Sequence, residues 1–91
     1  MKYRIQRTGQ FRRDVKRLMK RGKDIEKLLK TVELLANDIQ LPASCRDHAL
    51  KGNYSGFREC HIEPDWLLLY RKNKKQLTLI LLRSASYAEL F

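Results

Sequence analysis

The sequence predicts an α+β fold in which an N-terminal strand and an antiparallel helix hairpin precede a C-terminal antiparallel β-meander. Apolar residues follow a helical period through the first half of the chain, and short apolar or alternating stretches between turn residues fill the second half. With 91 residues, the chain is expected to be one domain spanning 1–91, since a second core would need roughly another hundred residues. The hairpin should pack on one sheet face and leave the other open.

The first half of the chain supplies the strand and the two helices. Residues 2–7 alternate apolar and polar side chains, which predicts a short strand. Thr8 is a candidate N-cap for a helix that ends at Gly22, and Asp24 is a candidate N-cap for a second helix. The link between the helices is short, which favours an antiparallel hairpin. The apolar stripes are Phe11, Val15, Leu18 and Met19 in the first helix and Ile25, Leu28, Leu29, Val32, Leu35 and Ala36 in the second.

The second half of the chain predicts the meander. The expected strands are residues 48–52, 56–62, 66–72 and 76–83. Pro64 and Asp65 suit the centre of a type I turn, because proline presets φ at the second position and aspartate tolerates the third. The leucine-rich runs in the last two strands predict central strands that are covered on much of both faces.

The charge of the chain indicates a polyanionic partner. Twenty Lys and Arg against ten Asp and Glu give a formal net charge of +10, and nucleic acid is the first candidate. No apolar run approaches the length of a membrane-spanning helix, no lipidation signal is visible, and the chain begins in a charged, strand-like stretch. We therefore expect a cytoplasmic protein with no membrane partner.

The two cysteines, Cys45 and Cys60, are expected to be free thiols, because they are too few for a disulfide framework. Their neighbours His48 and His61 raise the alternative of a zinc site. The spacing fits a tetrahedral site poorly, and adjacent strand residues such as Cys60 and His61 should point to opposite faces. The sequence therefore predicts no metal site and no cofactor.

The densest cluster of polar and aromatic residues lies between Asp47 and Asp65 and contains both histidines, His48 and His61. Histidine titrates near neutral pH, so a pair suits acid–base cleavage of RNA. In that reaction one group takes the 2′-OH proton, another protonates the leaving 5′-oxygen, and cations stabilise the phosphate. Two histidines alone do not separate this chemistry from ordinary surface histidines.

The stretch DHALKGNYSGFRECHIEPDWLLLYR, the ending RSASYAELF and the order of elements resemble the YafQ branch of the RelE/ParE toxin superfamily. The resemblance implies a toxin of a type II toxin–antitoxin system, a ribosome-dependent endoribonuclease that cuts mRNA in the A site without a metal. It also implies control by an antitoxin of the RelB/DinJ kind, which the charge of the chain predicts to be acidic. In that family the residues matching His48 and His61 are catalytic, the aspartate matching Asp65 is functional, and the phenylalanine matching Phe91 handles substrate.

One position departs from the family pattern. Where the family commonly has a third catalytic histidine, this chain has Tyr87. Tyrosine can donate a proton, but its reference pKa near 10 makes it a poor base at neutral pH. If His61 and Asp65 are hydrogen-bond neighbours at the turn, His61 is a candidate base, while His48 or Tyr87 serves the leaving group. The sequence leaves that division open.

Basic residues near this cluster are candidates for binding the scissile phosphate. They are Lys51, Arg58 and Arg83, of which the arginines can grip two oxygens at once. On a regular strand Arg58 should point away from His61, so its participation requires a bulge or twist.

Aromatic residues near the cluster are candidates for stacking on RNA bases. Trp66 is one of them, although core packing is an equal alternative for it. Tyr54 is a further candidate, and core packing is the favoured role for Phe57.

Two non-enzymatic functions remain as alternatives: a nucleic-acid-binding module and a gyrase-directed toxin of the ParE kind. The positive charge would serve these functions equally well. His48, His61 and Asp65 have a use only in the endoribonuclease, which the sequence therefore favours.

Overall fold

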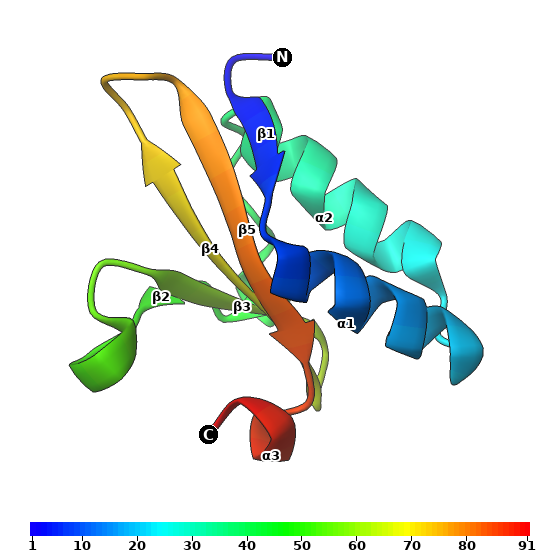
Figure 1. Ribbon diagram of the computed structural model, residues 1–91. Coiled ribbons are helices and arrows are strands. Elements are labelled where there is room, and N and C mark those ends of the chain that lie inside the picture. Colours follow the sequence, from blue (N-terminus) through cyan, green and yellow to red (C-terminus); the bar gives the residue numbers. More distant parts are fainter.

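The computed structural model describes all residues from 1 to 91 and consists of a five-stranded sheet, two long helices and a short C-terminal helix (Figure 1). The strands are β1 (Arg4–Arg7), β2 (His48–Ala49), β3 (Arg58–Glu63), β4 (Trp66–Asn73) and β5 (Thr78–Ala85). The helices are α1 (Gly9–Lys20), α2 (Ile25–Ala36) and α3 (Tyr87–Leu90), with two 3-10 turns, η1 (Ala43–Cys45) and η2 (Gly52–Tyr54). The predicted α+β fold class and element order are confirmed.

The sheet has the order β1-β5-β4-β3-β2. Strands β2 to β5 form the predicted antiparallel meander, and β1 joins its edge parallel to β5, which makes the sheet mixed. The strands expected at residues 48–52 and 56–62 correspond to β2 and β3, and β2 ends earlier and β3 begins later than expected. Gly52 and Gly56 have φ of +67° and +93°, so the chain turns through η2 there instead of continuing as a hairpin.

The predicted caps define both long helices. The Thr8 side chain accepts a hydrogen bond from the Phe11 amide, and the Asp24 side chain accepts one from Glu26. Gly22, with φ of +78°, follows α1 and allows the left-handed turn that ends it. Both helices lie on the same side of the sheet (Figure 1).

Two apolar clusters lie on the two faces of the sheet. The larger one contains fourteen buried residues from α1, α2 and the helix-facing side of the strands. The smaller one consists of Leu67, Leu69, Ala85 and Leu90. The expectation of an open second face is therefore wrong at this end, where α3 and the η2 loop cover it. The physical reason is that β4 carries apolar side chains on both of its faces from Trp66 to Tyr70, so both faces of the strand must be covered.

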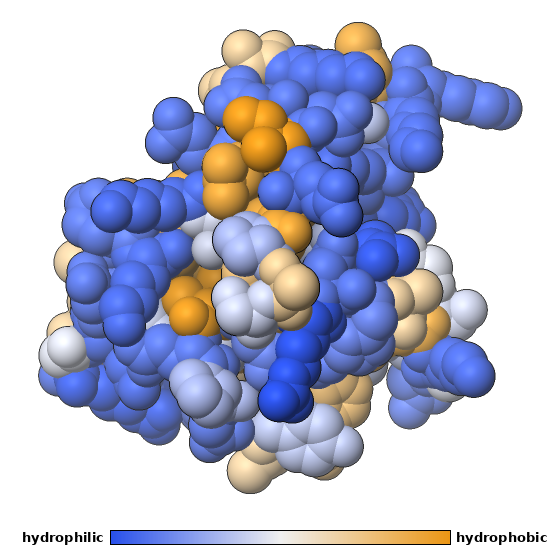
Figure 2. All heavy atoms as spheres, turned by 180° about the vertical axis from the view of Figure 1, so that it is seen from behind, coloured by the Kyte–Doolittle hydropathy of each residue, from blue (hydrophilic) through white to orange (hydrophobic).

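Seen from behind, the molecule shows a mostly hydrophilic face, with apolar side chains gathered near its middle and smaller apolar areas at its edges (Figure 2). No helix has the length and apolar character needed to cross a bilayer.

Candidate active site

Strand register aligns the candidate residues in two rows across one sheet face. The first row runs Arg83, Leu69, Glu59, His48 across β5, β4, β3 and β2. The second row runs Ala85, Leu67, His61. Paired residues on neighbouring strands share a face, and Leu67, Leu69 and Ala85 form the smaller apolar cluster. The two histidines therefore belong to the sheet face that α3 partly covers.

His48 lies between two hydrogen-bond acceptors. Its Nδ1 is 2.6 Å from the Arg46 carbonyl oxygen, and its Nε2 is 2.9 Å from Glu59 Oε2. A carbonyl and a carboxylate can only accept, so the ring satisfies both when both nitrogens carry protons. Half of the His48 side chain is exposed to solvent.

Glu59 is a site residue that the sequence reasoning missed. It is 6% exposed, and its second oxygen, Oε1, is buried without any hydrogen-bond partner. A buried carboxylate oxygen without a donor is costly and is rarely retained without a role. The sequence could have indicated Glu59, because it lies two residues before His61 and the two side chains therefore share one face of a strand.

His61 lies near the tip of the β3–β4 hairpin, as expected. Its Nδ1 is 3.2 Å from the Pro64 carbonyl oxygen, which can only accept, so Nδ1 is the donor and Nε2 makes no hydrogen bond within the chain. The expected hydrogen bond between His61 and Asp65 is absent. Asp65 instead accepts a hydrogen bond from the Tyr87 backbone amide at 3.1 Å, so it holds the first residue of α3.

Helix α3 presents two exposed aromatic rings. Tyr87 is 60% exposed and Phe91 is 51% exposed, and their centroids lie 4.9 Å apart at 35°. The helix is fixed by a Ser86–Glu89 capping box and by the buried Leu90. Hydrogen bonds from the Ser86 amide and from Arg21 hold the pKa of Glu89 below its ordinary value.

Arg83 is held by Asp14, a completely buried residue of α1. Arg83 donates to Asp14 from Nε at 3.0 Å and from Nη2 at 3.1 Å, and the Ser84 amide donates as well. Burial by itself raises the pKa of Asp14, but these bonds and those from Gln10 and Arg17 outweigh burial and lower it. Arg83 Nη1 makes no hydrogen bond, which leaves one edge of the guanidinium for a phosphate.

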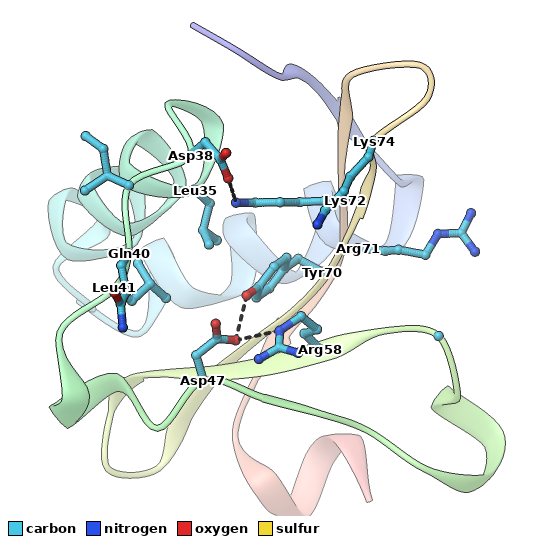
Figure 3. A pocket seen from close by; sticks show the side chains of 12 residues that line it. Leu35, Asp38, Gln40, Leu41, Asp47, Arg58, Tyr70, Arg71, Lys72 and Lys74 are labelled. Atoms are coloured by element: carbon cyan, nitrogen blue, oxygen red, sulfur yellow. Dashed lines mark hydrogen bonds and ion pairs between the residues drawn. The ribbon is translucent and has the colours of Figure 1, made fainter.

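Arg58 lies on the other face of the sheet, so the expectation that it reaches the scissile phosphate is wrong. It pairs with Tyr70 in the strand register, and both side chains donate to Asp47 Oδ1, at 3.2 and 2.6 Å (Figure 3). These residues line a polar cavity of about 510 Å³ between the end of α2 and the sheet. No bulge occurs at Arg58; the irregularity in β3 lies between His61 and Glu63.

The expectation that Trp66 stacks on RNA bases is also wrong. Its ring is 1% exposed, and its Nε1 donates to Ser84 Oγ at 2.9 Å within the core. The ring is thus core packing and presents no face for a base. Lys51, in contrast, is exposed beside η2.

The cysteines are free, and no group of three or more His, Cys, Asp or Glu side chains is arranged to hold a metal ion. Burial is the main reason that the pKa of each thiol, Cys45 and Cys60, lies above its ordinary value.

Known proteins resemble this chain over nearly its whole length. The family model described as "Bacterial toxin of type II toxin-antitoxin system, YafQ" matches residues 3–91. The "mRNA interferase toxin YafQ" of Escherichia coli K12 is 42% identical over 88 residues, which cover 96% of this chain and 94% of that protein.

Solved structures of bacterial toxins have the same fold as this chain. A metal-bound toxin from Helicobacter pylori superposes with a TM-score of 0.92 at 43% identity, covering 98% of this chain and 99% of that one. The Escherichia coli DinJ–YafQ toxin–antitoxin complex contains a chain that superposes with a TM-score of 0.88 at 39% identity, covering 100% and 99%. The chain therefore belongs to the YafQ family of bacterial toxins of type II toxin–antitoxin systems.

Proposed function

We propose that this chain is a ribosome-dependent endoribonuclease that cuts mRNA in the A site by metal-independent acid–base catalysis and so inhibits translation. The Escherichia coli relative is named an mRNA interferase toxin, which supports mRNA as the substrate. The observation that carries the mechanism is a pair of imidazoles with complementary hydrogen-bonding states, His48 between two acceptors and His61 with a free Nε2.

The two imidazoles suit different steps of one reaction. The 2′-oxygen attacks phosphorus as its proton passes to His61 Nε2, and the bond from phosphorus to the 5′-oxygen breaks. Charged His48 and the free edge of Arg83 stabilise the negative phosphate in the transition state. The products are a 2′,3′-cyclic phosphate and a 5′-hydroxyl.

Tyr87 is the proposed donor of the leaving-group proton. It is 60% exposed, its hydroxyl makes no hydrogen bond within the chain, and Asp65 fixes its backbone. Glu59 is proposed to keep His48 charged and oriented through Oε2, because its other oxygen is buried and closed to the substrate.

RNA is held by charge and by stacking. Lys51 and Arg83 are the proposed phosphate ligands, and Phe91 with Tyr87 forms an aromatic wall for a base. In a non-enzymatic RNA-binding module or a gyrase-directed toxin, the hydrogen-bonding states of His48 and His61 would have no role.

The proposed partners are the ribosome with its mRNA and a cognate acidic antitoxin, which would place the chain in the cytoplasm. The net charge of +10 supports both partners, since opposite charge speeds association. The DinJ–YafQ complexes of the relatives support the antitoxin.

Mapping the 5′ ends of cellular transcripts after brief induction tests this function. We expect new 5′-hydroxyl ends inside coding frames that disappear when translation is blocked and when His61→Gln replaces the parent chain. Cuts that persist without translation would contradict ribosome dependence, and an absence of cuts beside arrested replication would favour a gyrase-directed toxin.

A further inference from the structure

We propose that Tyr54, on the η2 loop, is a positioning residue that orients Phe91 within the aromatic wall that Phe91 forms with Tyr87. The inference rests on the proposed function, because the wall matters only if the chain binds RNA. It assigns to the η2 loop a part in holding the base beside the cleavage site.

Tyr54 makes two contacts with the C-terminal end of the chain. Its ring meets the Phe91 ring edge-on, with centroids 5.5 Å apart at 81°, and its hydroxyl donates to the Leu90 carbonyl oxygen at 3.4 Å. Edge-to-face pairs are favourable because the positive ring edge meets the negative ring face. Because 3.4 Å is long for a hydrogen bond between two oxygens, the ring contact carries this support, and Tyr54 fixes the direction of the Phe91 ring.

The Tyr54 ring is itself held in place. It packs against the cluster of Leu67, Leu69, Ala85 and Leu90, where it is partly buried. The Ser55 amide donates to Gly52, and the Phe57 amide donates to the Tyr54 carbonyl oxygen, which closes the loop on both sides of the residue. A fixed ring on a closed loop can hold a more exposed one.

Phe91 needs such support. The ring is 51% exposed, and its only aromatic neighbours are Tyr54 and Tyr87. Tyr87 is itself 60% exposed, so it provides a weaker anchor than the partly buried Tyr54. Without Tyr54 the Phe91 side chain would sample more rotamers, and binding RNA would cost the entropy of ordering it.

Single-turnover cleavage on mRNA-programmed ribosomes, at a series of toxin concentrations, tests the inference. Tyr54→Leu keeps apolar bulk but removes the ring, and the half-saturating concentration should rise roughly 2- to 12-fold with the plateau rate within about twofold. Tyr54→Phe keeps the ring and should remain within about twofold of the parent in both quantities.

Coupling to Phe91 is the decisive readout. If Tyr54 acts through Phe91, the double variant Tyr54→Leu, Phe91→Leu should bind no worse than Phe91→Leu alone. The inference would be overturned if the two substitutions raised the half-saturating concentration by factors that multiply in the double variant. It would also be overturned if Tyr54→Phe bound as weakly as Tyr54→Leu. Phe57→Leu is the matched control, because this nearby aromatic ring packs against Arg71 and forms no aromatic pair with Tyr87 or Phe91. An equal loss in this variant would also overturn the inference.

Two further outcomes are informative. If Tyr54→Leu does not fold by circular dichroism, Tyr54→Met, which fills irregular space, replaces it in the same cycle. A folded parent chain that cleaves nothing would overturn the proposed function and this inference together, whereas an active parent with multiplying effects would overturn the inference alone.

Discussion

Tyr87 is the residue at which this chain departs most from its family resemblance, and its surroundings give it a specific chemistry. Its backbone amide is held by Asp65, its ring packs on Phe91, and its hydroxyl is free. A phenol in that position can donate a proton to a leaving oxygen, although it is a poor base.

Tyr87→Phe keeps the ring and removes the proton, so the single-turnover rate should fall roughly a hundredfold or more. Tyr87→His restores the residue common in the family and should cleave at least as fast as the parent if imidazole chemistry suits the site. If the Phe variant keeps the parental rate while Tyr87→Ala loses about 1–3 kcal/mol of binding, Tyr87 stacks on RNA and donates no proton.

Glu59 gives a second prediction at this scale. In Glu59→Gln the amide oxygen can still accept from His48, but the negative charge that favours the imidazolium is gone. The plateau cleavage rate should fall on the order of tenfold to a hundredfold, with little change in the half-saturating concentration. A change in the half-saturating concentration alone would mean that Glu59 only shapes the RNA-binding surface.

At the scale of elements, α3 is a short helix whose position depends on contacts with distant segments. Asp65 from the β3–β4 turn, Arg21 from α1 and Tyr54 from the η2 loop all reach it. The aspartate that the family resemblance marks as functional thus holds α3 in this structure and makes no contact with His61.

Asp65→Asn tests that role, because an amide oxygen can accept from the Tyr87 backbone amide as a carboxylate does. We expect the Asn variant to retain the cleavage rate within about threefold and Asp65→Ala to lose about tenfold or more. An Asn variant as slow as the Ala variant would show that the carboxylate charge itself is required.

Elements governed by local chemistry were predictable from the sequence. Thr8 and Asp24 cap their helices through backbone amides two or three residues away, and Pro64 with Asp65 occupies the tight turn between β3 and β4. The roles of Glu59, Arg58 and Trp66 depend on which face each strand turns to the helices and on partners far along the chain, which periodicity does not specify. Residue type and family resemblance identified His48 and His61 from the sequence. Their hydrogen-bond acceptors could be identified only from the structure, because these contacts depend on the fold of the strands and loops.

At the scale of the whole molecule, Asp14 joins α1 to the end of β5 through charged hydrogen bonds. Its pKa is lowered in the folded chain, so its carboxylate stabilises the fold above the ordinary value of 3.8, and this contribution disappears as the pH falls through the folded pKa. The exposed carboxylates of Asp38, whose pKa is lowered to about 2, and of Glu63 act in the same direction but more weakly.

Urea unfolding between pH 7 and pH 2 should therefore show a fall in the free energy of unfolding that begins near pH 4. Asp14→Asn should lose about 3–5 kcal/mol at pH 7, because it leaves the partly buried Arg17 and Arg83 without their charged partner, and should show a shallower pH dependence. A parent chain whose stability does not change over this range would refute the role assigned to Asp14.

The central claim, cleavage by side-chain acids and bases, is tested most directly by the chemical ends of the RNA products on programmed ribosomes. The metal in the Helicobacter pylori toxin belongs to that protein, and in the mechanism proposed for this chain His48, His61 and Tyr87 would serve the proton transfers. We expect a 2′,3′-cyclic phosphate and a 5′-hydroxyl, with a rate that survives EDTA while the ribosomes are kept intact by a fixed free Mg²⁺ concentration. A 5′-phosphate product would contradict the account, because it requires attack by water in place of the 2′-oxygen.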